Sequence, residues 1–432
     1  MLFFQVGLVG GYAYAHIIRC HLTPRKQTIV HLTLLVLSLF FLPITPSEAW
    51  KPIGSQNPFV GVILLLSTTV GVPYLLVSSS SPLIQYWFNR VYPARSPYRL
   101  YALSNLGSLL GLLTYPFAIE LLLSLKVQTV FWSVSYGLYT AIFCWCAVRS
   151  GPVATETKLS AQSSQEHGTK PLVTDRLLWL LLTACGSVVL LAVTNQMCQD
   201  VAVIPFLWIL PLSLYLITFI ISFDRERWYQ RTVWVPVLLV SLAAVVYVLQ
   251  KNQEELVNIL QQIVVYSAAL FACCMVCHGE LVRLKPAASH LTSFYLMVAV
   301  GGALGGVLVN LAAPYLFDGY WELHVGFAGT YILLWICYLR RRNMRSSWWG
   351  WWLVRQLCVG GAGALIILLG INIHEKQTDS VASIRNFYGV LQVCETDAES
   401  LSRVRTLYHG QVCHGEQFLD DELRRQPTTY YG

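Results

Sequence analysis

The stretch TVWVPVLLVSLAAVVYVLQ, residues 232–250, decides the fold class of this chain. It contains no charged side chain, and Arg231 and Lys251 flank it. At 1.5 Å per residue, a helix of this length spans about 28 Å, close to the ~30 Å hydrocarbon core of a bilayer. The stretch therefore predicts a transmembrane helix.

Further apolar runs of similar character lie on both sides of this stretch. The predicted spans cover 1–19, 28–45, 59–81, 101–124, 127–148, 177–197, 205–223, 232–250, 257–277, 290–316, 323–339 and 347–371. Of the 432 residues, 55% are hydrophobic and only 12% are charged, about half the charged share of a soluble domain. The predicted fold is an all-α polytopic membrane protein with about twelve spans and a small β-rich extramembrane segment at the C-terminal end.

The basic residues alternate with the spans. The loops after every odd-numbered run hold 19 Lys and Arg residues, and the other loops hold only 3, namely Lys51, Lys126 and Lys251. Because basic loops stay in the cytoplasm, the sequence predicts a bacterial-type inner (plasma) membrane protein whose residues after Ile371 lie outside. The net charge of +7 follows largely from this asymmetry. The partners we expect are therefore the lipid bilayer and, in one alternative, other subunits of a membrane complex, and not nucleic acid.

A weak internal repeat links the two parts of the chain. The segment YALSNLGSLLG at 101–111 resembles YLMVAVGGALG at 295–305, with matching Tyr, Gly, Leu and Gly residues at a constant offset of 194. A repeat that keeps its orientation is typical of two parallel major-facilitator halves of six spans each. With this offset, one span of the first half is expected to precede Met1. The alternative is that glycine-rich helices resemble one another without a repeat.

These patterns predict five segments. They are a first membrane half at 1–149, a cytoplasmic linker at 150–175, a second membrane half at 176–346, an extra membrane helix at 347–371 and an extracytoplasmic β-hairpin segment at 372–432. The linker is rich in Ser, Thr, Gln and Gly, and such segments bury too little apolar surface to fold. The hairpin is predicted from two short strands at 387–394 and 404–410.

Polar residues within or beside the spans are candidate substrate contacts, because they are costly in hydrocarbon and usually face a cavity or a partner. Asn195, Gln196 and Asp200 cluster near the predicted outer end of 177–197, just before a proline. They predict an outward-facing polar pocket, and the alternative is a capped helix end with satisfied amides. Asn105 and Glu120 are the other candidates.

The cysteines suggest one covalent bond and no cofactor. Cys274, Cys277 and His278 match C-x-x-C-H, a pattern of haem attachment, and these residues could also bind a metal ion. Buried thiols more often pack as small apolar side chains, so we expect neither a haem nor a metal ion here. Cys394 and Cys413 lie outside the membrane region, in the segment placed outside, where disulfides persist. They are predicted to form a disulfide that closes a loop of roughly 20 residues.

Several motifs carry a resemblance to a known family. They are SPLIQYWF at 81–88, YALSNLGS at 101–108, PFLW at 205–208, CHGEL at 277–281, RNFYGV at 385–390, HG at 409–410 and HGEQ at 414–417. In this order they resemble the membrane-fused spermidine synthase-like family. That resemblance implies a major-facilitator-like membrane part joined to an aminopropyltransferase-like domain. Gln417 and Tyr430 match positions that flank the amine and donor pockets of soluble spermidine synthases.

The resemblance does not bring a complete catalytic domain. The family's glycine-rich turn and acidic ribose-binding residue would follow Gly432, so the chain is expected to be truncated at both ends and to perform no catalysis. The function we expect is a transporter-like module for an unknown substrate, an amine or a small polar solute. Two alternatives stay open. One is a non-catalytic accessory subunit of a membrane complex, and the other is a membrane-tethered aminopropyltransferase-like enzyme whose catalytic domain is absent here.

Overall fold

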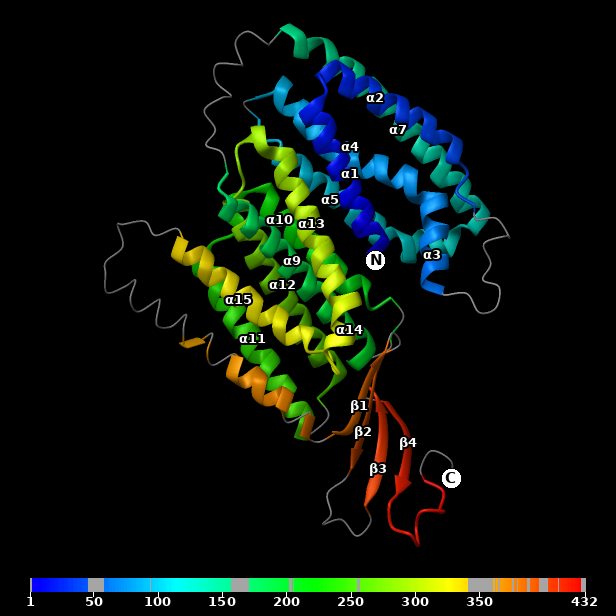
Figure 1. Cartoon of the computed structure of the whole chain (residues 1–432), viewed down its shortest axis with the longest axis vertical. Helices are drawn as coiled ribbons and strands as arrows, with labels where there is room; N and C mark the ends of the chain where they lie inside the picture. The colour runs from blue at the N-terminus through cyan, green and yellow to red at the C-terminus, as the bar shows by residue number, and fades with distance from the viewer. Residues whose placement is uncertain are drawn as a thin grey trace, which may run out of the picture. The chain divides into compact units, whose positions relative to one another are not determined.

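The chain is mostly helical, with one small sheet at its C-terminal end (Figure 1). The structure is a computed structural model, and it describes all residues except 1, 46–57, 94, 157–170, 202–203, 205, 255–256, 341–359, 362, 364–365, 375–376, 379, 387–388, 396–402, 411 and 429–432. It consists of two compact units. The first comprises Met1–Leu180, Phe219–Arg225 and Val282–Ala303, and the second comprises Leu181–Thr218, Glu226–Leu281 and Leu304–Gly432.

The helices follow the predicted spans in order. They are α1 (Leu2–His21), α2 (Pro24–Ser38), α3 (Pro58–Leu66), α4 (Val72–Val91), α5 (Tyr98–Thr114), α6 (Glu120–Leu122), α7 (Leu125–Glu156), α9 (Val173–Asn195), α10 (Ile209–Asp224), α11 (Arg231–Glu254), α12 (Ile259–Arg283), α13 (Leu291–Val307), α14 (Ala313–Leu316) and α15 (Glu322–Arg340). Four π-helical segments interrupt or extend them: η3 (Ser67–Gly71), η4 (Tyr115–Ile119), η5 (Gln196–Val201) and η8 (Leu308–Ala312).

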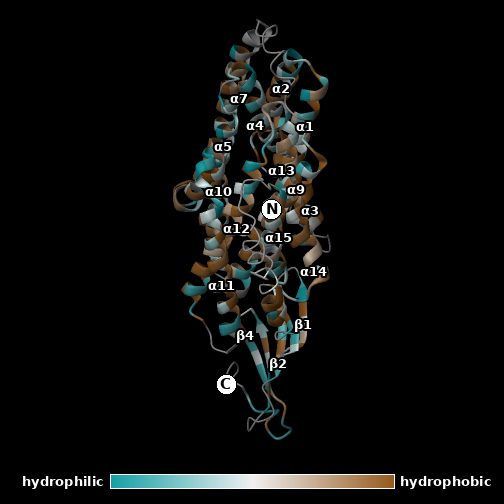
Figure 2. Cartoon of the chain, turned by 90° about the vertical axis from the view of Figure 1, so that its left-hand side faces the viewer, coloured by the Kyte–Doolittle hydropathy of each residue, from teal (hydrophilic) through white to brown (hydrophobic). Residues whose placement is uncertain are grey.

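Eight of the predicted spans are confirmed, among the described residues, as helices long and apolar enough to cross a membrane. Figure 2 shows hydrophobic residues along the lengths of the helices. This pattern is compatible with a multi-pass membrane protein. The predicted span at 28–45 is shorter than expected, because α2 has only 15 residues and reaches about 22 Å. Helix α1 has 20 residues but is not among the eight, so the predicted span at 1–19 is not confirmed. The apolar helix α10 has 16 residues and is also short, and most of the predicted span at 347–371 lies outside the described residues.

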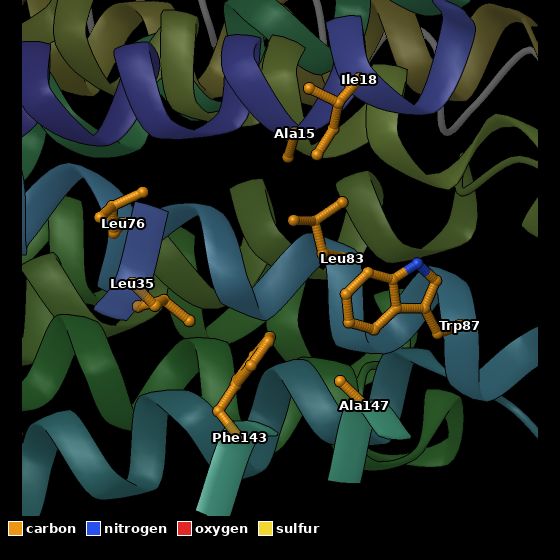
Figure 3. Close-up of a cluster of buried hydrophobic side chains, with 8 residues drawn as sticks. All are labelled: Ala15, Ile18, Leu35, Leu76, Leu83, Trp87, Phe143 and Ala147. Carbon is orange, nitrogen blue, oxygen red and sulfur yellow. The ribbon is translucent and has the colours of Figure 1, made fainter. Parts of the chain in front are cut away.

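A cluster of buried apolar side chains lies in the first unit (Figure 3). Its members come from α1, α2, α4 and α7: Ala15, Ile18, Leu35, Leu76, Leu83, Trp87, Phe143 and Ala147. Helices α1 and α4 approach closely because Gly11 has no side chain. A Cβ atom there would lie 2.8 Å from the carbonyl oxygen of Leu75. Small residues allow such backbone contact between membrane helices.

Close helix packing also occurs in the second unit. A Cβ atom at Gly305 would lie 2.5 Å from the carbonyl oxygen of Ala184 on α9. One glycine of the second repeat segment is therefore explained by packing against a neighbouring helix.

The sheet is an antiparallel meander with the strand order β1-β2-β3-β4 (Figure 1). Its strands are β1 (Ser380–Asn386), β2 (Gly389–Glu395), β3 (Val404–His409) and β4 (Val412–Phe418). The predicted hairpin corresponds to β2 and β3, whose pairing places Glu395 opposite Arg405. The Arg405 Nε atom donates to Glu395 Oε1 at 2.5 Å, and this hydrogen bond lowers the pKa of the Glu395 carboxyl group.

Two helices that are far apart in the sequence share the same layout. A 17-residue helix leads into a five-residue π-helical segment and then into a short helical end, both in α5–η4–α6 and in α13–η8–α14. The two helices begin at Tyr98 and Leu291, 193 residues apart, and the π-helical segments begin at Tyr115 and Leu308, again 193 residues apart. This spacing agrees within one residue with the offset of the sequence repeat, a difference within the uncertainty of helix ends.

Candidate functional site

The residues predicted to contact a substrate fall in both units. In the first unit, Asn105 is half-buried and donates its Nδ2 proton to the Tyr101 carbonyl oxygen at 2.9 Å, whereas Glu120 is exposed. In the second unit, Asn195 ends α9 and is half-buried, and Gln196 is 5% exposed at the start of η5. The side chain of Asp200 lies outside the described part.

Gln196 lines a small cavity in the second unit. The other lining residues come from α11, from the turn before α15 and its first turn, and from the sheet with its β3–β4 turn: Leu249, Gly319, Tyr320, Trp321, His324, Val390, Gln392 and Gly410. The cavity has a volume of ≈ 30 Å³, room for about two water molecules. We call this cavity, with the polar side chains around it, the junction site. Of the residues predicted to form a polar pocket, only Gln196 is among its described lining residues, and the sheet contributes to its wall.

Polar contacts hold the membrane-helix side of the junction site. Tyr320 donates its hydroxyl proton to Gln199 Oε1 at 2.6 Å. His324 Nε2 lies 3.3 Å from Asn372 Oδ1, and the His324 ring meets the Trp321 ring edge-to-face, with centroids 5.5 Å apart. The cavity is thus surrounded by amide, imidazole and aromatic groups, which can hydrogen-bond to the one or two water molecules that its volume admits.

A buried ion pair joins the sheet to α15. Arg385 of β1 donates from Nη2 to Glu322 Oε1 at 2.7 Å and from Nη1 to Glu322 Oε2 at 2.8 Å. Each side chain is 4% exposed. The Arg385 guanidinium also donates to the Gly319 carbonyl oxygen and lies over the Tyr320 ring, 4.8 Å from its centroid. A paired, bidentate geometry of this kind offsets the cost of burying two charges.

The glycine of the RNFYGV motif has a structural explanation. Gly389 begins β2 with φ of 144°, a region that side-chain-bearing residues rarely adopt. The His409 ring packs against it, so that a Cβ atom at Gly389 would lie 2.3 Å from His409 Nε2. The two motifs RNFYGV and HG therefore meet in adjacent strands, and they bring Val390 and Gly410 to the wall of the junction site.

The CHGEL motif forms a second buried node, away from the cavity. His278 Nδ1 lies 2.9 Å from Thr218 Oγ1. Glu280 is 1% exposed and accepts hydrogen bonds from Arg231 Nε at 2.6 Å and from the Tyr229 hydroxyl at 2.8 Å. A Cβ atom at Gly279 would lie 2.1 Å from Tyr229 Cγ, so only glycine admits this ring. The motif thus joins α10, α11 and α12.

This node does not support the haem or metal alternative for Cys274, Cys277 and His278. All three side chains are fully buried in the helix core. Covalent attachment of a haem needs both thiols and the imidazole to reach the porphyrin, which these positions do not allow. In the described part of the chain, no group of three or more His, Cys, Asp or Glu side chains is placed to hold a metal ion.

The predicted disulfide between Cys394 and Cys413 is not formed in the structure, where neither cysteine takes part in a disulfide. Cys394 lies on β2 opposite Thr406, and Cys413 lies on β4 opposite Tyr408, so β3 separates them. Strands two positions apart in a sheet are about 9.6 Å apart, beyond the roughly 7 Å that a disulfide allows between Cα atoms. The prediction was wrong because it assumed a two-stranded hairpin, whereas the sheet has a fourth strand that carries Cys413.

The positions matched to spermidine synthase pockets are less informative. Gln417 is exposed on β4 opposite Arg405, and Tyr430 lies outside the described residues. Neither lines the junction site.

Sequence reasoning missed most of the junction site. His324 lies inside the predicted span 323–339 and Glu322 directly precedes it, and ionisable residues within spans are rare and usually functional. That signal could have identified them. Arg385 lay within a recognised motif, but nothing local indicated that its partner was 63 residues away.

Comparisons with known proteins add no assignment. No family model matches the chain, and no curated protein matches it.

Proposed function

We propose that the membrane part of this chain is a transporter-like module, built from two parallel major-facilitator-like halves, for an amine or another small polar solute. The observation that carries the proposal is the shared layout of α5–η4–α6 and α13–η8–α14, displaced by 193 residues. A coincidence of glycine-rich sequence does not by itself produce a π-helical segment at the same place in both helices. π-Helical segments are rare and often occur at functional sites.

Contact between two repeat-equivalent residues supports the same proposal. The Tyr101 and Tyr295 rings are stacked within the first unit, with centroids 4.8 Å apart and planes 25° apart. Equivalent residues of two repeats can touch only where both lie beside the pseudo-two-fold axis that relates the repeats. Tyr295 also donates its hydroxyl proton to Gln85 Oε1 at 2.6 Å. This tyrosine pair is therefore a contact between the proposed halves.

The charges suggest what such a module would bind. Glu280 and Glu322 are 1% and 3% exposed, and each already binds an arginine. Proton- or sodium-coupled transport normally uses carboxylates that can exchange their partner. A solute would require the junction site to widen beyond its ≈ 30 Å³, and it would then meet neutral amide, imidazole and aromatic groups. This favours recognition of a small solute by hydrogen bonds and ring faces.

Reconstitution of the full chain in liposomes tests this proposal. Uptake of a panel of radiolabelled diamines, polyamines and neutral polar solutes is measured for the wild-type chain and for the variant Gln196→Ala. We expect uptake of at least one solute and a loss of apparent affinity of about tenfold in the variant, the cost of roughly one buried hydrogen bond.

Cross-linking provides an independent measurement of movement between the proposed halves. In a background without exposed native cysteines, Tyr101→Cys/Tyr295→Cys is treated with a short thiol cross-linker. We expect the yield of cross-linked protein to change when the transported solute is added. The control pair Phe4→Cys/Tyr74→Cys lies within one half, where the wild-type rings are 5.2 Å apart, and should not respond. No uptake of any solute, together with an unchanged yield, would refute the transporter proposal.

One observation favours the second candidate, an accessory subunit that presents an extramembrane domain. The sheet is held to the membrane helices by Arg385–Glu322 and by a hydrogen bond from Ser383 Oγ to the Asp318 carbonyl oxygen at 3.0 Å. A rigidly held sheet suits a platform better than a mobile lid. Purification from native membranes under mild conditions distinguishes the two, because an accessory subunit co-purifies with stoichiometric partner chains.

A further inference from the structure

A second cavity lies in the first unit, where the connection between α4 and α5 meets the end of α10. Its volume is ≈ 660 Å³, and Arg95, Ser96, Arg99 and Asp224 form its polar side. This volume would accommodate a charged headgroup with its glycerol, and it is more than twentyfold larger than the ≈ 30 Å³ of the junction site. We call this cavity the arginine cavity.

The charge of the arginine cavity is positive. Asp224 is shared between two arginines, with Oδ1 3.2 Å from Arg99 Nη2 and Oδ2 3.5 Å from Arg225 Nε. The Arg95 guanidinium lies over the Tyr92 ring, 5.6 Å from its centroid, and no carboxylate is within ion-pair distance of it among the described residues. Two guanidinium groups and one carboxylate therefore line the cavity, and Arg225, which is outside the lining, neutralises part of the carboxylate charge. Guanidinium groups bind phosphate oxygens through paired hydrogen bonds.

The rest of the cavity wall is apolar and continues into an exposed apolar stripe on α5 and η4. Leu103 and Leu106 line the cavity and are 62% and 38% exposed. Leu110, Leu113 and Phe117 follow at helical spacing and are 55%, 36% and 72% exposed. From the first to the last of these residues the stripe is about 21 Å long, longer than the ~15 Å thickness of one leaflet.

We propose that the arginine cavity binds the headgroup of an anionic phospholipid, whose acyl chain lies along the α5 stripe. The arginines select the negative charge, and the stripe selects a lipid over a free phosphate. Basic cavities next to membrane helices bind anionic headgroups in this way. The site is separate from the junction site and does not depend on whether the module transports a solute.

Native mass spectrometry of the full chain in mild detergent tests this assignment. The protein is titrated with phosphatidylglycerol or phosphatidylcholine of identical acyl chains, and the binding constant of the tightest site is measured. We expect a clear preference for phosphatidylglycerol. Each arginine should raise the binding constant for phosphatidylglycerol about fivefold, so Arg95→Gln/Arg99→Gln should weaken phosphatidylglycerol binding about thirtyfold. Phosphatidylcholine binding should change little.

Two further variants separate this effect from a general loss of structure. Asp224→Asn removes the competing carboxylate and should strengthen phosphatidylglycerol binding by about fivefold, the opposite sign to the arginine variants. Arg227→Gln is the matched control, since Arg227 is also an exposed arginine over an aromatic ring, at 5.2 Å from the Trp228 centroid, but does not line the cavity. It should bind both lipids as the wild type does.

The outcome that overturns the proposal is equal binding of the two lipids, or unchanged phosphatidylglycerol binding in Arg95→Gln/Arg99→Gln. A soluble competitor decides between a lipid and a free anion. Glycerophosphoglycerol and inorganic phosphate carry the charge without the acyl chains and should compete poorly. Competition as strong as that of the intact lipid would show a phosphate site and exclude the role of the α5 stripe.

Discussion

Replacing Glu322 by glutamine should release the sheet from the membrane helices while leaving the helices folded. The variant keeps the size of the side chain but removes its charge, and Arg385 stays buried at 4% exposure. Breaking a buried pair by removing one partner costs about 3–5 kcal/mol, because the remaining charge is uncompensated. Arg385 retains the Gly319 carbonyl oxygen and the Tyr320 ring, so we expect a value near the lower end, about 3 kcal/mol.

This free energy can be measured as local opening of the sheet. Hydrogen exchange of the full chain in lipid nanodiscs reports the protection of backbone amides in β1 and β2. Because each 1.4 kcal/mol is a factor of ten, Glu322→Gln should increase the exchange of these amides by roughly a hundredfold. The amides of α12 should exchange as in the wild type.

A control and a rescue variant make the result specific. Glu395→Gln removes a carboxylate that also binds an arginine in the same sheet, but that pair is exposed to solvent, so little change is expected. Glu322→Gln/Arg385→Met removes the stranded charge and should restore most of the protection, since apolar replacement of a buried pair is often neutral. Unchanged exchange in Glu322→Gln, or a double variant worse than the single one, would refute the assigned role of the ion pair.

Three other predictions concern the remaining nodes. Gly279→Ala should destabilise the second unit by about 1–3 kcal/mol, because the added methyl group overpacks against the Tyr229 ring. Thermal unfolding in detergent measures this loss, and Gly279→Ala/Tyr229→Ala should recover part of it. The arginine partner on β3 lowers the pKa of Glu395 in the folded state. The ionised Glu395 therefore contributes to sheet stability at pH values above its unfolded-state pKa. This contribution is lost as the pH falls through the lower folded-state pKa. The protection factors of the β2 and β3 amides, corrected for the intrinsic pH dependence of exchange, should therefore fall in acid for the wild type by only the small amount expected of an exposed pair, and they should depend less on pH in Glu395→Gln. Cys394 and Cys413 should both react with a thiol reagent in denaturant without reductant, and failure of both to react would restore the predicted disulfide.

The apolar spans could be predicted because each depends on its own residues. A run such as 232–250 has to be helical wherever it lies in hydrocarbon, since every backbone group must be satisfied within the segment. The structure has a helix, α11, at Arg231–Glu254. The resemblance between residues 101–111 and 295–305 was visible for a related reason, because a glycine pattern in one helix can be compared directly with the pattern in another.

The sheet shows where local information ends. The pairing of β2 with β3 follows from two short apolar strands joined by a polar connection, and the sequence predicted it. The fourth strand begins after only two intervening residues, within a stretch whose apolar and polar residues do not alternate clearly. Because β4 carries Cys413, β3 lies between Cys394 and Cys413. Strand order is a property of the whole sheet, so a spacing of cysteines along the chain could not determine their distance.

The sequence by itself determined the positions of eight helices that are long and apolar enough to cross a membrane. Hydropathy is a sum over neighbouring residues, and a polar amide at the end of an apolar run is visible in that sum. Only the tertiary structure decided that Arg385 binds Glu322, that Arg231 binds Glu280, and that the sheet forms part of the cavity wall. Each of these ion pairs joins residues about 50 or more positions apart, and which charges meet depends on helix packing and strand order rather than on any local pattern.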